Sequence, residues 1–252
     1  MWVSKKKVLI VAGSDSVGGA GVQADIKSCE AFGCFSASVI TAVTAQNTNG
    51  VSNVLAMPAS MVKAQFEMVL AELDIDAVKV GILVNEEIIA GVSAFLKDLR
   101  AKNVPVVIDP VCVAKSGAKL LEDGAIEALK ELLSLASVAT PNVDEARILG
   151  INFTNLPCDM VLKRTKVDEI CEDTLYLKNG GVMKFSEELF EPKVIHGAGC
   201  SFSSSLVAIL AQQSDLVSAI KMAKKFVANG IKNAHKSKFG ARLIDHKAGL
   251  NG

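Results

Sequence analysis

Short runs of β-branched and other apolar residues alternate along this chain with longer amphipathic stretches, and this alternation limits its fold more than any other feature. The runs expected to form strands are Val8–Ala12, Val39–Thr44, Ala77–Val80, Val104–Ile108, Ser137–Thr140 and Met160–Lys163. Most of them lack the apolar–polar alternation of a half-exposed strand, which is typical of parallel strands covered on both faces. The pattern therefore predicts right-handed βαβ units and an α/β fold with a mostly parallel sheet.

The longer stretches carry the periodicity of helices. The expected helices lie at Val22–Cys29, Ser60–Leu70, Asn85–Lys102, Ala125–Leu133, Ser201–Ala211 and Leu216–Lys232. After Thr174, the residues on either side of Asn179-Gly180 predict a β-hairpin, which is antiparallel in an otherwise parallel fold. No repeat or linker divides the chain, so residues 1–252 are expected to form one domain.

Composition excludes several classes of protein. Half of the residues are hydrophobic, and 27 basic residues balance 27 acidic ones, which argues against a disordered chain, a nucleic-acid binder or a membrane-surface binder. Six cysteines without a CxxC pair and three histidines do not form a zinc framework, and reduced thiols fit a cytoplasmic location. The apolar run Val8–Ala12 is too short for a signal peptide, and polar residues interrupt the uncharged stretch Ala31–Val62, so it cannot span a membrane.

Two expected strands end in segments suited to binding a small molecule, because ligands of open α/β sheets lie beyond the carboxyl ends of the strands. Residues 13–21, Gly-Ser-Asp-Ser-Val-Gly-Gly-Ala-Gly, lead from the first strand into a helix, and glycines let backbone N–H groups approach a ligand closely. The segment fits neither GxxxxGK[ST] nor GxGxxG, so a tight turn is the alternative. Gln46 follows the second strand, where its amide could read a heteroaromatic ring; the alternative is a turn stabilised by Asn47.

Two carboxylates occupy comparable positions. Asp109 ends a strand, and Glu145 lies in the first turn of a short helix. Together they could hold a hydrated Mg²⁺ ion, which takes few protein ligands and several waters. For Glu145 the alternative is an acidic residue favoured there by the helix dipole.

The segment Gly197-Ala198-Gly199-Cys200 opens a helix of small and apolar residues. Its unpaired N–H groups and the helix dipole predict an anion hole. At this position we expect the pKa of the Cys200 thiol to be lowered, which would make Cys200 a proton acceptor; a buried structural cysteine is the alternative. For His196 we expect a hydrogen-bonded structural role.

Six segments, in order between residues 6 and 246, resemble the hydroxymethylpyrimidine/phosphomethylpyrimidine kinases of the ribokinase-like superfamily. They are residues 12–25, 39–48, 79–83, 114–117, 140–142 and 196–200. The resemblance implies a three-layer α/β/α fold and a cytoplasmic enzyme of thiamine biosynthesis. Such an enzyme uses ATP and Mg²⁺ to phosphorylate 4-amino-5-hydroxymethyl-2-methylpyrimidine and then its monophosphate. The resemblance also suggests a homodimer.

The resemblance further implies roles for individual residues. The pyrimidine pocket would be lined by Gly13, Asp25, Gln46, Gly81, Ile82 and Val111. The ATP phosphates would meet Lys163, Gly197, Ala198 and Gly199. Cys200 would accept the hydroxyl proton while Gly197 and Gly199 cradle the phosphoryl group, Asp109 and Glu145 would order Mg²⁺, and residues 114–117 would form a flap.

The chain departs from the family pattern on the ATP side. It has Lys163-Arg164-Thr165 where the family reads Lys-Gly-Gly, and its segment 150–160 is short. The larger side chains could crowd the phosphates, or Arg164 could add a cationic contact. Two alternatives to a pyrimidine kinase therefore stay open: a non-catalytic pyrimidine sensor, and a pyridoxal or pyridoxine kinase.

Overall fold

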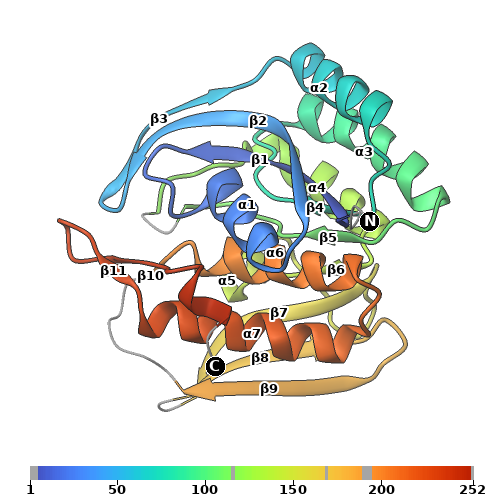
Figure 1. Cartoon of the computed structure of the whole chain (residues 1–252). Coiled ribbons are helices and arrows are strands. Elements are labelled where there is room, and N and C mark those ends of the chain that lie inside the picture. The colour runs from blue at the N-terminus through green and yellow to red at the C-terminus, as the bar shows by residue number, and fades with distance from the viewer. Residues whose placement is uncertain (1–4, 115–116, 168–169, 189–194, 251–252) are drawn as a thin grey trace, which may run out of the picture.

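A computed structural model describes residues 5–114, 117–167, 170–188 and 195–250. Within this part of the chain, nine strands form one sheet in the order β3-β2-β1-β4-β5-β6-β7-β8-β9 (Figure 1). The strands are β1 Lys7–Asp15, β2 Phe35–Asn47, β3 Gly50–Ala56, β4 Ala77–Val80, β5 Val106–Ile108, β6 Val138–Ala139, β7 Asp159–Val167, β8 Ile170–Tyr176 and β9 Val182–Glu188. Six neighbouring strands of this sheet, β2, β1, β4, β5, β6 and β7, are parallel, as the alternation of runs predicts.

Helices cover both faces of the sheet, which gives the expected three layers (Figure 1). On one face lie α1 (Gly21–Ala31), α6 (Ala198–Ala211) and α7 (Leu216–Lys232). The opposite face is covered by α2 (Ala59–Glu72), α3 (Glu86–Ala101) and α4 (Ile126–Leu132). A short helix, α5 (Val143–Ile148), follows β6, and 3₁₀ turns lie at Asp123–Ala125, Leu133–Leu135 and Ala248–Leu250.

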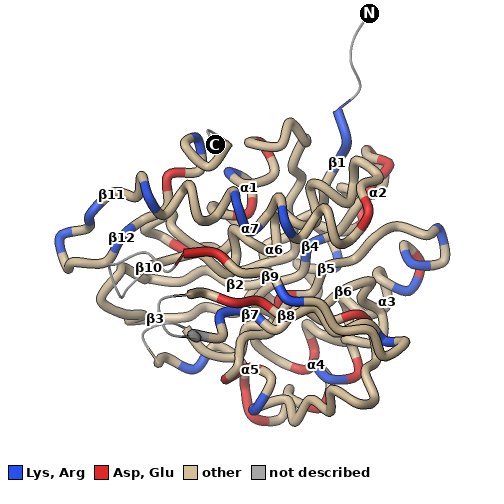
Figure 2. The backbone as a smooth tube through the Cα atoms, turned by 90° about the horizontal axis from the view of Figure 1, so that it is seen from below, with Lys and Arg blue, Asp and Glu red and all other residues tan. Residues whose placement is uncertain are grey.

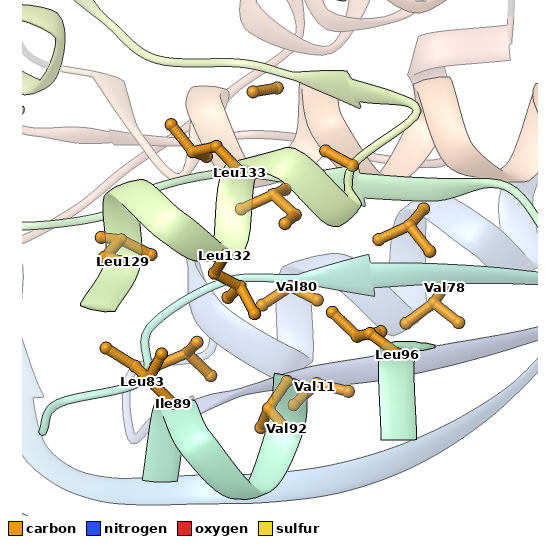
Figure 3. Packing of buried hydrophobic residues seen from close by; sticks show 14 of the residues in the cluster. Val11, Val78, Val80, Leu83, Ile89, Val92, Leu96, Leu129, Leu132 and Leu133 are labelled. Atoms are coloured by element: carbon orange, nitrogen blue, oxygen red, sulfur yellow. The ribbon is translucent and has the colours of Figure 1, made fainter. Parts of the chain in front are cut away.

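Strand β1 shows why the central strands are apolar throughout. Leu9 and Val11 pack into the cluster beneath α2, α3 and α4, whereas Val8 and Ile10 pack against α1 and α6. Successive side chains of a strand point to opposite faces, so a strand between two helical layers buries all of them. Figure 3 shows part of the first cluster, in which Val11 and Val80 meet side chains of α3 and α4.

The structure corrects the expectation of a single antiparallel ribbon. The predicted hairpin is present as β8 and β9, but β7 also pairs antiparallel with β8, and β3 pairs antiparallel with β2 at the other edge. Strand β3 carries no apolar pattern because most of its side chains are exposed at the sheet edge. A second, three-stranded sheet contains β10 (Ile195–His196), β12 (Arg242–Leu243) and β11 (His235–Lys236).

Charged residues of both signs are interspersed over the elements, in keeping with the balanced composition (Figure 2). None of the helices in the described ranges is long and apolar enough to cross a bilayer.

Candidate active site

A cavity of about 680 Å³ opens where the parallel strands end. It brings together most of the residues expected at the site, from both its pyrimidine side and its ATP side: Gly13, Gln46, Ile82, Asp109, Val111, Glu145, Lys163, Gly197, Ala198, Gly199 and Cys200. Gln46 and Cys200, which are 154 positions apart in the chain, therefore face one shared space. Asp25 and Gly81 are not among the lining residues.

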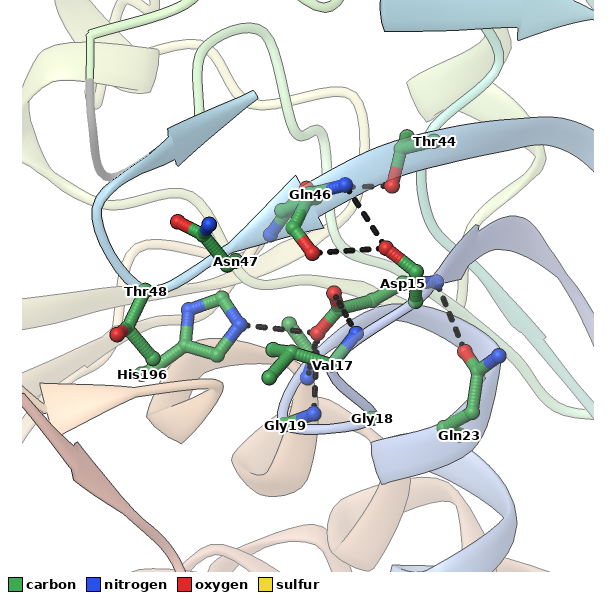
Figure 4. A network of polar contacts seen from close by, with 12 residues as sticks. Asp15, Val17, Gly18, Gly19, Gln23, Thr44, Gln46, Asn47, Thr48 and His196 are labelled. Carbon is green, nitrogen blue, oxygen red and sulfur yellow. Dashed lines mark hydrogen bonds and ion pairs between the residues drawn. The ribbon is translucent and has the colours of Figure 1, made fainter. Parts of the chain in front are cut away.

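Asp15, at the end of β1, organises the glycine-rich turn (Figure 4). Its carboxylate accepts hydrogen bonds from the backbone N–H groups of Val17, Gly19 and Ala20, at 3.1, 3.0 and 2.8 Å. Its Oδ2 also lies 2.9 Å from Nε2 of His196. Burial alone would raise the pKa of the Asp15 carboxyl, but these hydrogen bonds hold it below its ordinary value.

The glycines of this turn serve close packing against the start of α6. A Cβ on Gly197, whose φ is +86°, would overlap the Gly19 carbonyl oxygen, and a Cβ on Gly19 would lie 2.5 Å from the His196 ring. The turn after β1 and the turn before α6 are thus in direct contact. His196 is 8% exposed and hydrogen bonded, as expected, and it also lines the cavity.

Asp25 lies beneath the cavity in a buried ion pair. Its Oδ2 is 2.7 Å from Lys79 Nζ, and its Oδ1 accepts a 2.6 Å hydrogen bond from Ser204 of α6. Burial would lower the pKa of the Lys79 ammonium, but the Asp25 carboxylate holds it above 10.5. Burial raises the pKa of Asp25, and the Lys79 charge opposes this rise. Asp25 therefore supports α6 from below, and it does not face the cavity as the resemblance implies.

Lys163, on β7, reaches across the sheet to the end of β5. Its Nζ lies 2.5 Å from Asp109 Oδ1, and both side chains are almost fully buried. A Cβ on Gly199 would be 3.3 Å from the same Nζ, so the ammonium lies next to the first turn of α6. Although burial raises the pKa of Asp109, the charges of Lys163 and Lys79 hold it below its ordinary value.

Glu145 forms a capping box at the start of α5. Its Oε2 accepts the Asn142 N–H at 2.8 Å, while Asn142 Oδ1 accepts the Glu145 N–H at 2.8 Å. Burial raises the pKa of Glu145 to about 7. The positive charge of Lys163 opposes this rise, and the negative charge of Asp109 adds to it. Glu145 thus caps the helix with one oxygen and also lines the cavity.

Cys200 differs from the expectation in its acidity. Burial raises the pKa of the thiol to about 11, and the nearby Lys79 charge and the Gly21 N–H only partly oppose this. The lowered pKa inferred from the helix N-terminus is therefore wrong, because the loss of hydration around the sulfur outweighs the dipole.

Sequence reasoning missed two residues of this region, Asp15 and Lys79. Each had a signal: Asp15 is an acidic residue inside a glycine-rich turn, and Lys79 is the one charge in the strand Ala77–Val80. Within the expected flap, Lys115 and Ser116 lie outside the described residues, while Ala114 and Gly117 line the cavity.

A helix N-terminus, a lysine and two carboxylates at the carboxyl edge of this sheet order are typical of the ribokinase-like kinases of small molecules. Comparison with known proteins agrees. Solved pyridoxal kinases have the same fold: the Staphylococcus aureus enzyme, in complex with AMP-PCP and pyridoxal, superimposes with a TM-score of 0.84 at 30% identity, over 97% of this chain and 94% of that one. A phosphomethylpyrimidine kinase structure from Clostridium difficile gives 0.72 at 34% identity, over 89% and 98%.

Sequence comparison identifies the family. The profile described as phosphomethylpyrimidine kinase matches residues 15–245. The Haemophilus influenzae hydroxymethylpyrimidine/phosphomethylpyrimidine kinase is 40% identical over 90% of this chain and 91% of its own length. A thiamine biosynthesis bifunctional protein from Geobacter sulfurreducens is 37% identical over 95% of this chain, which spans 52% of that protein. The chain belongs to the phosphomethylpyrimidine kinase family and is a kinase.

Proposed function

We propose that this kinase transfers the γ-phosphoryl group of ATP to the hydroxymethyl oxygen of 4-amino-5-hydroxymethyl-2-methylpyrimidine, and then phosphorylates the monophosphate to the diphosphate. The observation that carries this proposal is the shared cavity of Gln46 and Cys200. A ring read at the end of β2 would place its alcohol toward the start of α6, where phosphate is best stabilised. The names of the relatives support the same reaction in thiamine biosynthesis.

The pyrimidine side of the site would be formed by Gly13, Gln46, Ile82 and Val111. The Gln46 amide would pair with the amino group and a ring nitrogen, and Ile82 and Val111 would supply apolar contact to the ring faces. Asp25 and Gly81 do not line the cavity, so they would support the pyrimidine-binding residues without contacting the ring.

On the phosphoryl side, the N–H groups at Gly197–Gly199 and the Lys163 ammonium would stabilise the group in flight. A bond forms between the hydroxymethyl oxygen and the γ-phosphorus while the bond from that phosphorus to the β-bridging oxygen breaks. The hydroxyl proton passes to the thiolate form of Cys200. Because the transition state is loose, most of the acceleration comes from position and charge.

The donors for Mg²⁺ fit that ion. Asp109 and Glu145 both line the cavity. Asp109 Oδ1 accepts from Lys163 and Thr140, Ser203 also hydrogen bonds to the Asp109 carboxylate, and Glu145 Oε2 accepts the Asn142 N–H. Mg²⁺ is held by one or two carboxylates with waters and phosphate oxygens, and when bound it would neutralise charge on the nucleotide phosphates. The mutual repulsion of Asp109 and Glu145 is the kind of strain that a cation relieves.

A coupled assay of ADP release tests the proposal, with purified protein, ATP, Mg²⁺ and the hydroxymethylpyrimidine. We expect turnover with the alcohol and with its monophosphate. Folded protein that binds the pyrimidine in calorimetry but neither binds ATP nor turns over would instead be the sensor considered above.

Pyridoxal kinase is the second candidate function. It is favoured by one observation: solved pyridoxal kinases superimpose at TM-scores of 0.83–0.84, above the 0.72 of the phosphomethylpyrimidine kinase structure. Rates on the two alcohols, measured side by side under the same conditions, decide between them. A kcat/KM for pyridoxal above that for the pyrimidine would reverse our assignment.

We propose further that the single domain works as a cytoplasmic homodimer. Val43 and Leu55 face each other across β2 and β3 and are 46% and 67% exposed, and Met61 and Met68 of the adjoining α2 are also exposed. An apolar surface of this kind supports contact with a second copy. Light scattering after size exclusion tests it, with Leu55→Glu as the variant expected to shift the mass to that of a monomer.

A further inference from the structure

The backbone of β7 is irregular next to Lys163. Pairing with β8 shifts between Leu162 and Thr165, which places a β-bulge at Lys163 and Arg164. Arg164 has φ +62°, in the left-handed region where a residue with a Cβ is disfavoured. Such a conformation persists only where the surroundings hold it, and it is found most often at functional sites.

Two buried groups hold the bulge. The Arg164 N–H donates to Asp173 Oδ1 at 2.7 Å, and Asp173 Oδ2 pairs with Lys224 Nζ at 2.7 Å. Asp173 is 4% exposed and Lys224 is 6% exposed, so β8 and α7 together fix the backbone of β7 at this point.

The bulge changes where the Arg164 side chain goes. In a regular strand, successive side chains point to opposite faces, so Lys163 and Arg164 would not meet the same ligand. Here both line the active-site cavity. A bulge re-aims a side chain in this way, and the effect is to present two consecutive cations to one space.

Among the cavity-lining cations of the described ranges, Arg164 has no ion-pair partner within 4 Å, although its charge acts on Glu145. Lys163 pairs with Asp109, and Arg147 pairs with Asp144 at 3.2 Å. The Arg164 guanidinium makes no ion pair or hydrogen bond with any residue in the described ranges, and the side chain is exposed. A free guanidinium presents a planar fork of donors that matches phosphate oxygens.

The position of Arg164 in the sheet indicates which phosphate it meets. Four strand-to-strand steps, about 19 Å, separate β1 from β7. The glycine-rich turn follows β1, and Gln46 lies at the end of β2. The Lys163 ammonium, next to the first turn of α6, lies between these two segments and Arg164. Arg164 is thus on the far side of the phosphoryl-transfer point from the pyrimidine.

We infer that Arg164 binds the polyphosphate of the nucleotide, and that Asp173 and Lys224 are positioning residues that hold it there. The inference rests on the proposed function, because it assumes that ATP enters this end of the cavity. Under this inference, the Arg164 side chain binds the phosphates and does not crowd them, which was the alternative considered from the sequence.

Calorimetry on the full chain with AMP-PCP, AMP and adenosine tests the inference. Two variants separate charge from backbone: Arg164→Ala removes the charge and keeps the Cβ, whereas Arg164→Gly also removes the conformational strain. We expect both to weaken AMP-PCP binding roughly 10–100-fold, as for the loss of a charged hydrogen-bonding partner, to weaken AMP binding less, and to leave adenosine within about twofold. Arg164→Gly should melt no lower than the wild type.

Lys184→Ala is the matched control, because Lys184 carries the same charge on β9 and pairs with Glu172 outside the cavity lining. It should bind AMP-PCP as the wild type does. Asp173→Asn should weaken AMP-PCP binding in the wild-type background but add little to Arg164→Ala, a coupling that a merely structural role would not produce.

Two results would overturn the inference. If the wild type binds AMP-PCP and both Arg164 variants bind it equally well, Arg164 has no part in nucleotide binding although the kinase assignment stands. If the wild type turns over no substrate and binds no AMP-PCP, the proposed function fails, and this inference fails with it.

Discussion

At the scale of single residues, the acidity of Cys200 has a kinetic consequence. With a thiol pKa of about 11, the thiolate fraction rises tenfold per pH unit across the neutral range. If the thiolate accepts the hydroxyl proton, kcat should rise with pH between 7 and 9. Cys200→Ala should lower kcat by roughly 10²–10⁴-fold, abolish this rise and leave pyrimidine affinity nearly unchanged. A pH series of initial rates at saturating substrates measures both; a wild-type profile that is flat and equal to that of the variant would remove Cys200 from the mechanism.

Gln46 should act on binding. Gln46→Ala removes the amide that would pair with the ring, so we expect pyrimidine affinity to fall about 10-fold or more while ATP affinity is kept. Calorimetry with each ligand separates the two effects. Asn47→Ala is the control, since Asn47 Oδ1 only accepts hydrogen bonds within its own turn, from Asn49 and Gly50. Unaltered pyrimidine affinity in Gln46→Ala would mean that the ring is read elsewhere.

Gly13, Gln46 and Asp109 could be predicted from the sequence because they follow buried strands, and the carboxyl ends of parallel strands meet at one edge. Ile82, Val111 and Lys163 were expected only from the family resemblance. Asp25 could not be placed in this way. It lies on a helix, α1, and its partner Lys79 is 54 positions away, so only the tertiary structure shows that the pair is buried beneath the cavity. The pKa of Cys200 depends likewise on burial that no local pattern reports.

At the scale of elements, the helices were predicted best, because local chemistry marks their ends. Asn85 caps α3 by accepting the Ile88 N–H, and α7 runs from Leu216 to Lys232 as expected. Strand β3 and the bulge in β7 were not foreseen. The first is exposed at an edge, and the second depends on Asp173 and Lys224 from other elements.

The end of α6 offers a test of these local rules. Gln213 follows the C-cap residue Gln212 with φ +64°, and it is exposed. Glycine is favoured at this position, so Gln213→Gly should raise the free energy of unfolding by about 1 kcal/mol. Gln213→Ala keeps a Cβ in the same conformation and should bring no gain. Urea unfolding of the three proteins measures the difference, and equal stability of the glycine and alanine variants would contradict the assignment.

At the scale of the whole molecule, a buried group whose pKa differs between the folded and the unfolded chain makes the free energy of unfolding depend on pH. His246 is such a group: it is 7% exposed, its Nε2 lies 2.9 Å from Ser201 Oγ in α6, and burial lowers its pKa to about 4. The folded protein thus keeps the imidazole neutral. The resulting stability is fully present above pH 6.5, the ordinary pKa, and is lost as the pH falls from 6.5 toward 4.

We therefore expect wild-type protein to lose about 2 kcal/mol more stability than His246→Gln between pH 7 and pH 5, from about 1.4 kcal/mol per pH unit below 6.5. Comparing two pH values within each protein cancels the packing cost of the substitution, because that cost is the same at both. His235→Gln is the control, since the His235 side chain is 73% exposed. Urea unfolding of all three proteins at both pH values measures the effect. Parallel losses in all three would mean that His246 protonates as readily in the folded chain as in the unfolded one.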